Sequence, residues 1–254
     1  MSEVFDELYS EYYDLLYKNK DYSKESHYVF NQIKKHSPNK ISSLLELGCG
    51  TGGHAIHWLP DVDTWTGVDL SSSMLAQCKS NLEKFKSKID LVESDINKLS
   101  LNKKFDAILS LFHVVSYQDS NEKLDNFFRV ASTHMKEGAI LAFDFWHGAA
   151  VLSDRPLPKL LEVKNDNLKV TRFTNSKMLF SENIVQVDFK VWIDSIHTNE
   201  RKEIFESHRM RYLFETELSY FASKHGLKII SLSKWLSDDQ LDDKAWYGFA
   251  VLVK

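Results

Sequence analysis

Cysteine is scarce in this sequence, and features that would mark a membrane or exported protein are missing. The two cysteines, Cys49 and Cys78, show no metal-ligand spacing, so we expect no metal site and a reduced, cytoplasmic compartment. No apolar run is long enough to span a bilayer. The acidic stretch at residues 1–7 lacks the apolar region of a signal peptide. We therefore expect a cytoplasmic protein without a membrane partner.

An excess of one charge is also missing, because 32 basic residues stand against 36 acidic ones, a formal net charge of −4. A surface that follows nucleic-acid phosphates is usually strongly basic, so we expect no nucleic-acid partner. With 254 residues, 43% of them hydrophobic, the chain can bury a full core as a single domain. Its oligomeric state is left open, with a homodimer among the alternatives.

The most informative stretch runs from Leu44 to Gly53, where an apolar segment passes into closely spaced glycines. This pattern predicts a buried strand, a tight turn and a helix whose free N–H groups face a ligand. Gly48, Gly50 and Gly53 satisfy G-x-G-x-x-G, which occurs in both dinucleotide and S-adenosylmethionine sites. The glycines alone therefore leave the ligand undecided.

Strands and helices alternate around this stretch, which predicts an α/β fold with a doubly wound, mostly parallel sheet. Two helices come first, at 3–18 and 23–35, and the first is rich in tyrosine. The core strands are expected at 42–47, 64–69, 88–93, 105–111 and 139–145, with helices near 52–59, 72–86 and 121–135. After a loop at 150–160, period-2 runs within 160–214 predict an inserted antiparallel sheet. A helix at 216–225 and strands at 228–234 and 247–253 complete the pattern.

Three carboxylates help to choose the ligand. Asp69 ends the second strand about twenty residues after the glycines, where it can accept both hydroxyls of a ribose. Glu46 precedes the first glycine, where an anion would repel a pyrophosphate but suits a sulfonium and an α-ammonium group. Asp95 follows the third strand and can accept from an adenine amine. These positions favour S-adenosylmethionine over a nicotinamide dinucleotide.

At these residues the chain resembles the class I S-adenosylmethionine-dependent methyltransferases. The matching segments are Glu46–Gly52, Gly67–Leu75, Glu93–Ile96, Phe105–Ile108 and Gly248–Val251. The resemblance implies a Rossmann-like seven-stranded sheet, the cofactor S-adenosyl-L-methionine, the product S-adenosyl-L-homocysteine and transferase activity (EC 2.1.1). It also implies the cofactor-binding residues, which are Tyr13, Tyr17, Lys20, Tyr22, Glu46, Gly48, Gly50, Asp69, Met74, Asp95, Ile96, Leu111 and Phe112.

A narrower resemblance covers nearly the whole chain. Tyr13–Leu15, Lys20–Tyr22, Val170–Arg172 and Glu206–Arg209 are similar to the sugar-modifying branch, whose best-understood members N-methylate nucleotide-linked amino sugars. The sequence departs from that branch at Trp246-Tyr247, where those enzymes tend to carry an arginine for the phosphates. The resemblance implies one domain in four parts: a helical lid (1–38), a cofactor-binding core (39–148), an acceptor-side insert (149–214), and a last helix with edge strands (215–254).

Side chains beyond the strand ends are candidates for the transfer itself. His113 and Tyr117 follow the fourth strand, and His208 lies in the insert, so these three are the candidate catalytic residues. The predicted acceptor pocket contains Asp144, Trp146, Arg172 and Arg209. We expect methyl transfer to nitrogen or oxygen of a small hydrophilic acceptor, either a sugar, an amino sugar or a group of a surface or capsular polysaccharide. The alternatives are an NAD(P)-dependent oxidoreductase and a non-catalytic binding module.

Overall fold

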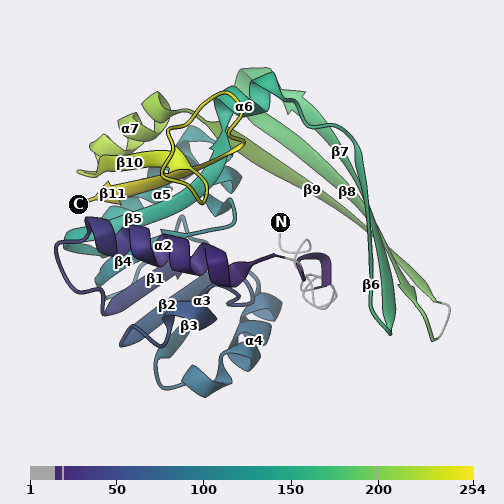
Figure 1. Ribbon diagram of the computed structural model, residues 1–254, viewed down its shortest axis with the longest axis horizontal. Coiled ribbons are helices and arrows are strands. Elements are labelled where there is room, and N and C mark those ends of the chain that lie inside the picture. Colours follow the sequence, from purple (N-terminus) through teal and green to yellow (C-terminus); the bar gives the residue numbers. More distant parts are fainter. Residues whose placement is uncertain (1–14, 19, 198–199) are drawn as a thin grey trace.

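A central sheet in the order β3-β2-β1-β4-β5-β11-β10 organises the computed structural model, which describes residues 15–18, 20–197 and 200–254 (Figure 1). The first five strands are parallel, and β11 lies antiparallel between β5 and β10. This confirms the predicted doubly wound, mostly parallel sheet. The strand bounds are β1 Ser43–Leu47, β2 Thr64–Asp69, β3 Ile89–Glu93, β4 Phe105–Ser110, β5 Met135–His147, β10 Lys228–Lys234 and β11 Tyr247–Val253.

Helices cover both faces of this sheet, and each face has its own apolar core. One core gathers side chains of α5 (Asn121–His134) and α7 (Glu215–Lys224), and the other those of α2 (Tyr22–His36), α3 (Ala55–Trp58) and α4 (Ser72–Asn81). Helix α5 illustrates the local cause. Its buried residues recur at helical spacing, and the Ser120 side chain accepts a hydrogen bond from Lys123 N at its first turn.

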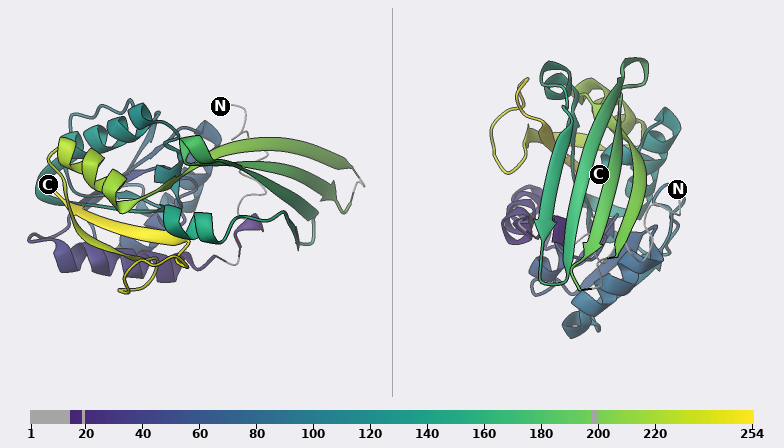
Figure 2. Two further views of the ribbon diagram at one scale, coloured as in Figure 1. Left: turned by 90° about the horizontal axis from the view of Figure 1, so that it is seen from above. Right: turned by 90° about the vertical axis from the view of Figure 1, so that its right-hand side faces the viewer.

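The insert is a four-stranded antiparallel meander of β6 (Lys159–Lys164), β7 (Leu168–Leu179), β8 (Ile184–Ser195) and β9 (Arg201–Leu213). Its last strand joins the central sheet, because Tyr212 pairs in parallel with Trp146 at the end of β5. Strand β4 has already ended there, so β9 takes its place beside β5. The long strands then curve away from the core (Figures 1 and 2), and the sheet continues from the core into the insert.

The loop predicted at 150–160 is mostly wrong. Helix α6 (Gly148–Ser153) occupies its first part and β6 begins at Lys159, which leaves only residues 154–158 between them. Ala150 and Val151 are fully buried in α6, so tertiary packing stabilises a short helix that its length alone would not. The two prolines, Pro156 and Pro158, then prevent the helix from continuing.

Other boundaries differ by a few residues. The helix expected at 52–59 is limited to α3, and the one expected at 72–86 ends at Asn81, before a 3₁₀ turn at Glu83–Phe85. The tyrosine-rich helix expected at 3–18 falls largely outside the described residues. Among the described helices, none is long and apolar enough to cross a membrane.

Candidate active site

A cavity of about 460 Å³ lies beyond the carboxyl ends of the parallel strands and extends to the inner face of the insert. The glycine turn and Asp69 line one part of it, and residues of β7, β8 and β9 line the other. Twelve of the predicted site residues line this cavity: Tyr17, Gly48, Gly50, Asp69, Met74, Leu111, Phe112, His113, Tyr117, Trp146, Arg172 and His208. The core and the insert therefore contribute to a single site.

The glycine turn has a backbone that few other residues could adopt. Gly48 has φ +79°, and a Cβ added there would lie 2.6 Å from a methyl carbon of Val114. Gly50 has φ +53°, and its N–H donates to Asp69 Oδ2 at 2.8 Å. Asp69 Oδ1 accepts from Ser71 N at 3.0 Å. Burial raises the pKa of Asp69, although these backbone N–H groups act to lower it.

Glu46 lies behind the turn and does not line the cavity. Its side chain is buried, and its carboxyl group accepts a hydrogen bond from the indole of Trp65 at 3.1 Å. Burial raises the pKa of Glu46 to about 8, and the Trp65 hydrogen bond only partly opposes this change. The carboxyl group is therefore poised to ionise when a cation approaches.

Phe112 and His113, just after β4, both adopt left-handed backbone conformations with φ near +64° and +63°. Such φ values are unfavourable for bulky residues and indicate a strained turn that its surroundings hold in place. Asp144 supplies that hold: its carboxylate accepts from His113 N at 3.0 Å and lies 2.7 Å from His113 Nδ1. Burial acts to raise the pKa of Asp144, but His113 outweighs it and the pKa is lowered. Asp144 thus fixes His113 without lining the cavity itself.

Two aromatic residues of the site were not predicted. The ring of Tyr247 stacks on the imidazole of His113 with centroids 4.5 Å apart, and Trp246 packs against Trp146. Both line the cavity. They are the residues at which the sequence departs from the sugar-modifying branch, and that departure was the signal that could have identified them.

On the insert, Arg172 and His208 point to the cavity from neighbouring parts of one face. The guanidinium carbon of Arg172 lies 4.7 Å from the ring centre of Phe189, and Arg172 Nη1 donates to the Tyr17 hydroxyl at 3.2 Å. His208 Nδ1 lies 3.2 Å from the Tyr117 hydroxyl, which joins the insert to the core. Phe189 is a further cavity residue that the sequence analysis missed, because its role depends on the strand register.

Several predicted site residues lie close to the cavity but do not line it. Lys20 pairs with the buried Glu25 at 2.6 Å, and its ammonium lies 4.2 Å from the ring centre of Phe112. Tyr22 packs edge-on against His54. Like Glu46 and Asp144, these two residues are near the site but are not part of the cavity wall.

Three further residues that the sequence predicted for the site make their contacts outside the cavity. Asp95 accepts from Asn97 N at 2.9 Å in a local turn, and Ile96 packs against the apolar core. Arg209 forms ion pairs with Asp119 at 3.0 Å and with Glu182, and it does not line the cavity. Tyr13 lies outside the described residues.

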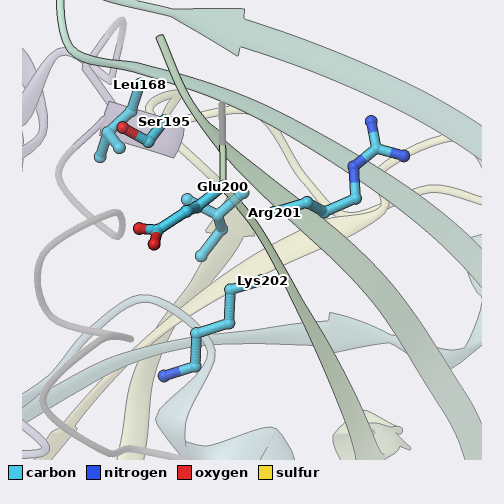
Figure 3. A pocket seen from close by; sticks show the side chains of 6 residues that line it. Leu168, Ser195, Glu200, Arg201 and Lys202 are labelled. Atoms are coloured by element: carbon cyan, nitrogen blue, oxygen red, sulfur yellow. The ribbon is translucent and has the colours of Figure 1, made fainter. Parts of the chain in front are cut away.

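A second hollow lies where β7, β8 and β9 approach the tip of the insert, lined by Leu168, Ser195, Glu200, Arg201 and Lys202 among others (Figure 3). It contains none of the predicted site residues, and Arg201 is already paired with Asp194 at 2.6 Å. In the described parts of the chain, no three His, Cys, Asp or Glu side chains cluster closely enough to hold a metal ion.

The chain is similar to known proteins both in sequence and in structure. Residues 44–138 match the family described as "Methyltransferase domain". Over 185 residues the chain is 26% identical to the dTDP-3-amino-3,4,6-trideoxy-alpha-D-glucopyranose N,N-dimethyltransferase of Streptomyces venezuelae, covering 72% of this chain and 76% of that protein.

Solved structures agree on the fold. An S-adenosylmethionine-dependent methyltransferase from Clostridium acetobutylicum superposes with a TM-score of 0.82 at 21% identity, over 96% of each chain. The sugar N-methyltransferase KedS8 from Streptoalloteichus gives a TM-score of 0.80 at 20% identity, over 95% of this chain and 92% of that one. These similarities do not support the oxidoreductase or the non-catalytic module that the sequence left open. The chain therefore carries a methyltransferase domain at residues 44–138 and is similar in sequence and in fold to S-adenosylmethionine-dependent methyltransferases.

Proposed function

We propose that this enzyme transfers a methyl group from S-adenosylmethionine to the amino group of a small sugar, bound between the core and the insert. The observation that carries the proposal is the shared cavity, in which Gly48, Gly50 and Asp69 face the same space as Arg172 and His208. A displacement reaction needs its two reactants side by side in one water-poor site. The relative from Streptomyces venezuelae, named for an amino-sugar substrate, supports the choice of acceptor.

The residues present fit the cofactor. A Cβ added at Gly50 would meet no protein atom within 4 Å, so the turn leaves open space beside its backbone. Asp69 ends β2 next to that space, where its carboxylate can accept the hydroxyls of a ribose. Glu46, behind the turn, can ionise and so supply negative charge when a cationic ligand binds. When bound, S-adenosylmethionine would supply an electrophilic methyl group on its sulfonium, with the neutral thioether as the leaving group.

The acceptor side of the cavity suits a sugar. The indole N–H of Trp146 and the Nε–H of Arg172 are buried, and neither has a hydrogen-bond partner among the described residues. Buried donors that lack a partner are costly, so ring hydroxyls that accept from them would be bound favourably. The rings of Tyr247 and Phe189 offer flat apolar surface for the faces of a sugar ring.

The chain's own contribution is to hold the amine and to exclude water. His113 is fixed in orientation by Asp144 on one side and by the stacked ring of Tyr247 on the other. Tyr117, from the same turn, presents its hydroxyl to the cavity and can orient the lone pair of an amine. We infer that the insert, which carries Arg172 and His208, selects the acceptor.

The first test is calorimetric titration with S-adenosylhomocysteine, with NADH titrated in parallel. We expect micromolar binding of S-adenosylhomocysteine, about −8 kcal/mol, and no binding of NADH. Asp69→Ala should weaken that binding by about 1–3 kcal/mol through lost charge-assisted hydrogen bonds. Asp90→Ala is the matched control, since Asp90 is an exposed carboxylate paired with Lys103. Unchanged affinity in Asp69→Ala would show that the cofactor site is assigned wrongly.

The acceptor is then tested with a set of amino sugars, free and nucleotide-linked, each paired with the corresponding hydroxy sugar. Methyl transfer is followed by mass spectrometry with S-adenosylmethionine in excess. We expect one or two added methyl groups on the amino sugars and none on the hydroxy sugars. Methylation of the hydroxy sugars alone would replace nitrogen with oxygen as the acceptor atom.

A further inference from the structure

Three polar side chains form a continuous row from the cavity wall into the insert. The Tyr117 hydroxyl lies 3.2 Å from His208 Nδ1, and His208 Nε2 lies 3.1 Å from Glu206 Oε2. Tyr117 faces the cavity and is 36% exposed, whereas His208 and Glu206 are each 5% exposed. Tyr117 comes from the turn after β4 and the other two from β9, so the row spans the junction of core and insert.

The chemistry of the three groups gives this row a direction. A carboxylate only accepts, so His208 donates its Nε2–H to Glu206 and leaves Nδ1 to accept the Tyr117 O–H. If the imidazole gains a proton, Nδ1–H donates to the phenol oxygen instead, and Glu206 balances the new charge. A nucleophile or acid–base group, a base and an orienting carboxylate in series are the arrangement used for proton transfer in many active sites.

We propose that this row removes a proton from the ammonium group of the acceptor, a proposal that rests on the proposed function. Glu206 is the positioning residue, because it orients His208 to act as the base. The ammonium N–H donates to the Tyr117 oxygen while the Tyr117 proton passes to His208 Nδ1. The ammonium becomes a neutral amine, the phenol is unchanged in charge, and His208 becomes an imidazolium beside Glu206. The proton leaves through the cavity when the product does.

The reaction has a need for such a path. A primary alkylammonium group has a pKa of about 10.4 in water, so most of an alkylamine acceptor arrives protonated at neutral pH. Its nitrogen has no lone pair until that proton has gone. Although part of the Tyr117 side chain is exposed, burial of its hydroxyl raises the pKa, so the hydroxyl stays protonated and acts as a carrier and not as a permanent base. Among the described residues, the charges of Tyr17, Glu206 and Asp69 act on the Tyr117 hydroxyl. Arg172 of β7 and His208 both lie against the ring of Phe189.

The competing explanation is that the row merely holds the insert against the core. The two explanations differ in what the acceptor's protonation state should do. Three variants interrupt the row at successive points: Tyr117→Phe, His208→Ala and Glu206→Gln. Asp188→Asn is the matched control, because Asp188 lies on the other face of the same strands, where it accepts from Ser207 at 2.6 Å.

Each protein is assayed at pH 7 and pH 9.5 with the best amino sugar and with its alkoxyamine analogue, whose nitrogen is uncharged at neutral pH and keeps its lone pair. We expect kcat for the amino sugar at pH 7 to fall about 100-fold or more in the three variants, with little change in KM. The loss should shrink at pH 9.5 and nearly vanish with the alkoxyamine. Added imidazole should restore part of the activity of His208→Ala, and Asp188→Asn should behave as the parent.

Losses that are equal for both acceptors and at both pH values would overturn the relay and leave the row as a structural contact, and so would full activity in all three variants. If His208→Ala does not fold, as judged by circular dichroism and S-adenosylhomocysteine affinity, Tyr117→Phe decides, since it removes a single oxygen from a cavity wall. A parent enzyme that methylates no amine would instead refute the proposed function, and with it the relay.

Discussion

Replacing Glu46 with glutamine should make the cofactor-free protein more stable at neutral and alkaline pH and should weaken cofactor binding. Glu46 is buried at the end of β1, and its pKa of about 8 lies far above the ordinary value of 4.5. Glutamine has nearly the same shape and keeps an oxygen that can accept from the Trp65 indole, as the carboxyl group does at 3.1 Å. The substitution therefore replaces an ionisable carboxyl group with a neutral amide while leaving the packing in place.

The size of the expected change in unfolding free energy follows from the pKa of Glu46. A carboxyl group whose pKa is raised on folding binds its proton more tightly in the folded state, so stability falls as pH rises between 4.5 and about 8. At pH 7 this lowers the unfolding free energy by about 3 kcal/mol, and above pH 8 by about 5 kcal/mol. The buried amide that Glu46→Gln introduces has its own desolvation cost, so we expect a net gain of about 1–3 kcal/mol at pH 8.

The assay is urea unfolding of parent and Glu46→Gln at pH 5 and pH 8, followed by circular dichroism. The two proteins should differ little at pH 5 and clearly at pH 8. Calorimetric titration with S-adenosylmethionine at pH 7, in two buffers of different ionisation enthalpy, should show proton release on binding to the parent and none with Glu46→Gln. Affinity of the variant should fall, because it lacks the charge that a cationic ligand attracts.

The opposite stability pattern would refute this reasoning. If the stability of Glu46→Gln relative to the parent did not rise from pH 5 to pH 8, folding would not raise the pKa of Glu46. If binding to the parent released no proton at pH 7, Glu46 would not ionise in response to the ligand.

Three further substitutions test other parts of the site. Gly48→Ala should lower stability by about 1–2 kcal/mol, because alanine is disfavoured at φ +79° and its Cβ would displace Val114, and a thermal melt should shift down by several degrees. Asp144→Asn should lower stability at pH 7 by about 1–3 kcal/mol, because His113 loses its charged partner. The lowered pKa of Asp144 gives the parent a stability that is present above the ordinary value of 3.8 and is lost as pH falls through the folded-state pKa. Urea unfolding should therefore show the two proteins converging in stability at acidic pH. Arg172→Gln should raise the acceptor KM by about 10- to 100-fold without changing S-adenosylhomocysteine affinity, which steady-state kinetics and calorimetry would separate.

The sequence alone determined the order and type of most elements, and with them the glycine-turn side of the cavity. Apolar runs and turn residues act over a few positions, so strands such as Thr64–Asp69 and Tyr247–Val253 could be predicted residue by residue. The carboxyl ends of parallel strands meet at one edge of a sheet, and this rule was enough to predict that Gly48, Asp69 and His113 lie together.

Only the tertiary structure decided how distant side chains meet. Asp144 holds the strained turn at His113, and Tyr247 stacks on the same ring from the last strand. The register of β9 turns His208 toward Tyr117, and a shift of one residue would have turned it away. These contacts join segments far apart in the chain, and their geometry depends on packing and strand register, which no local pattern of residues encodes.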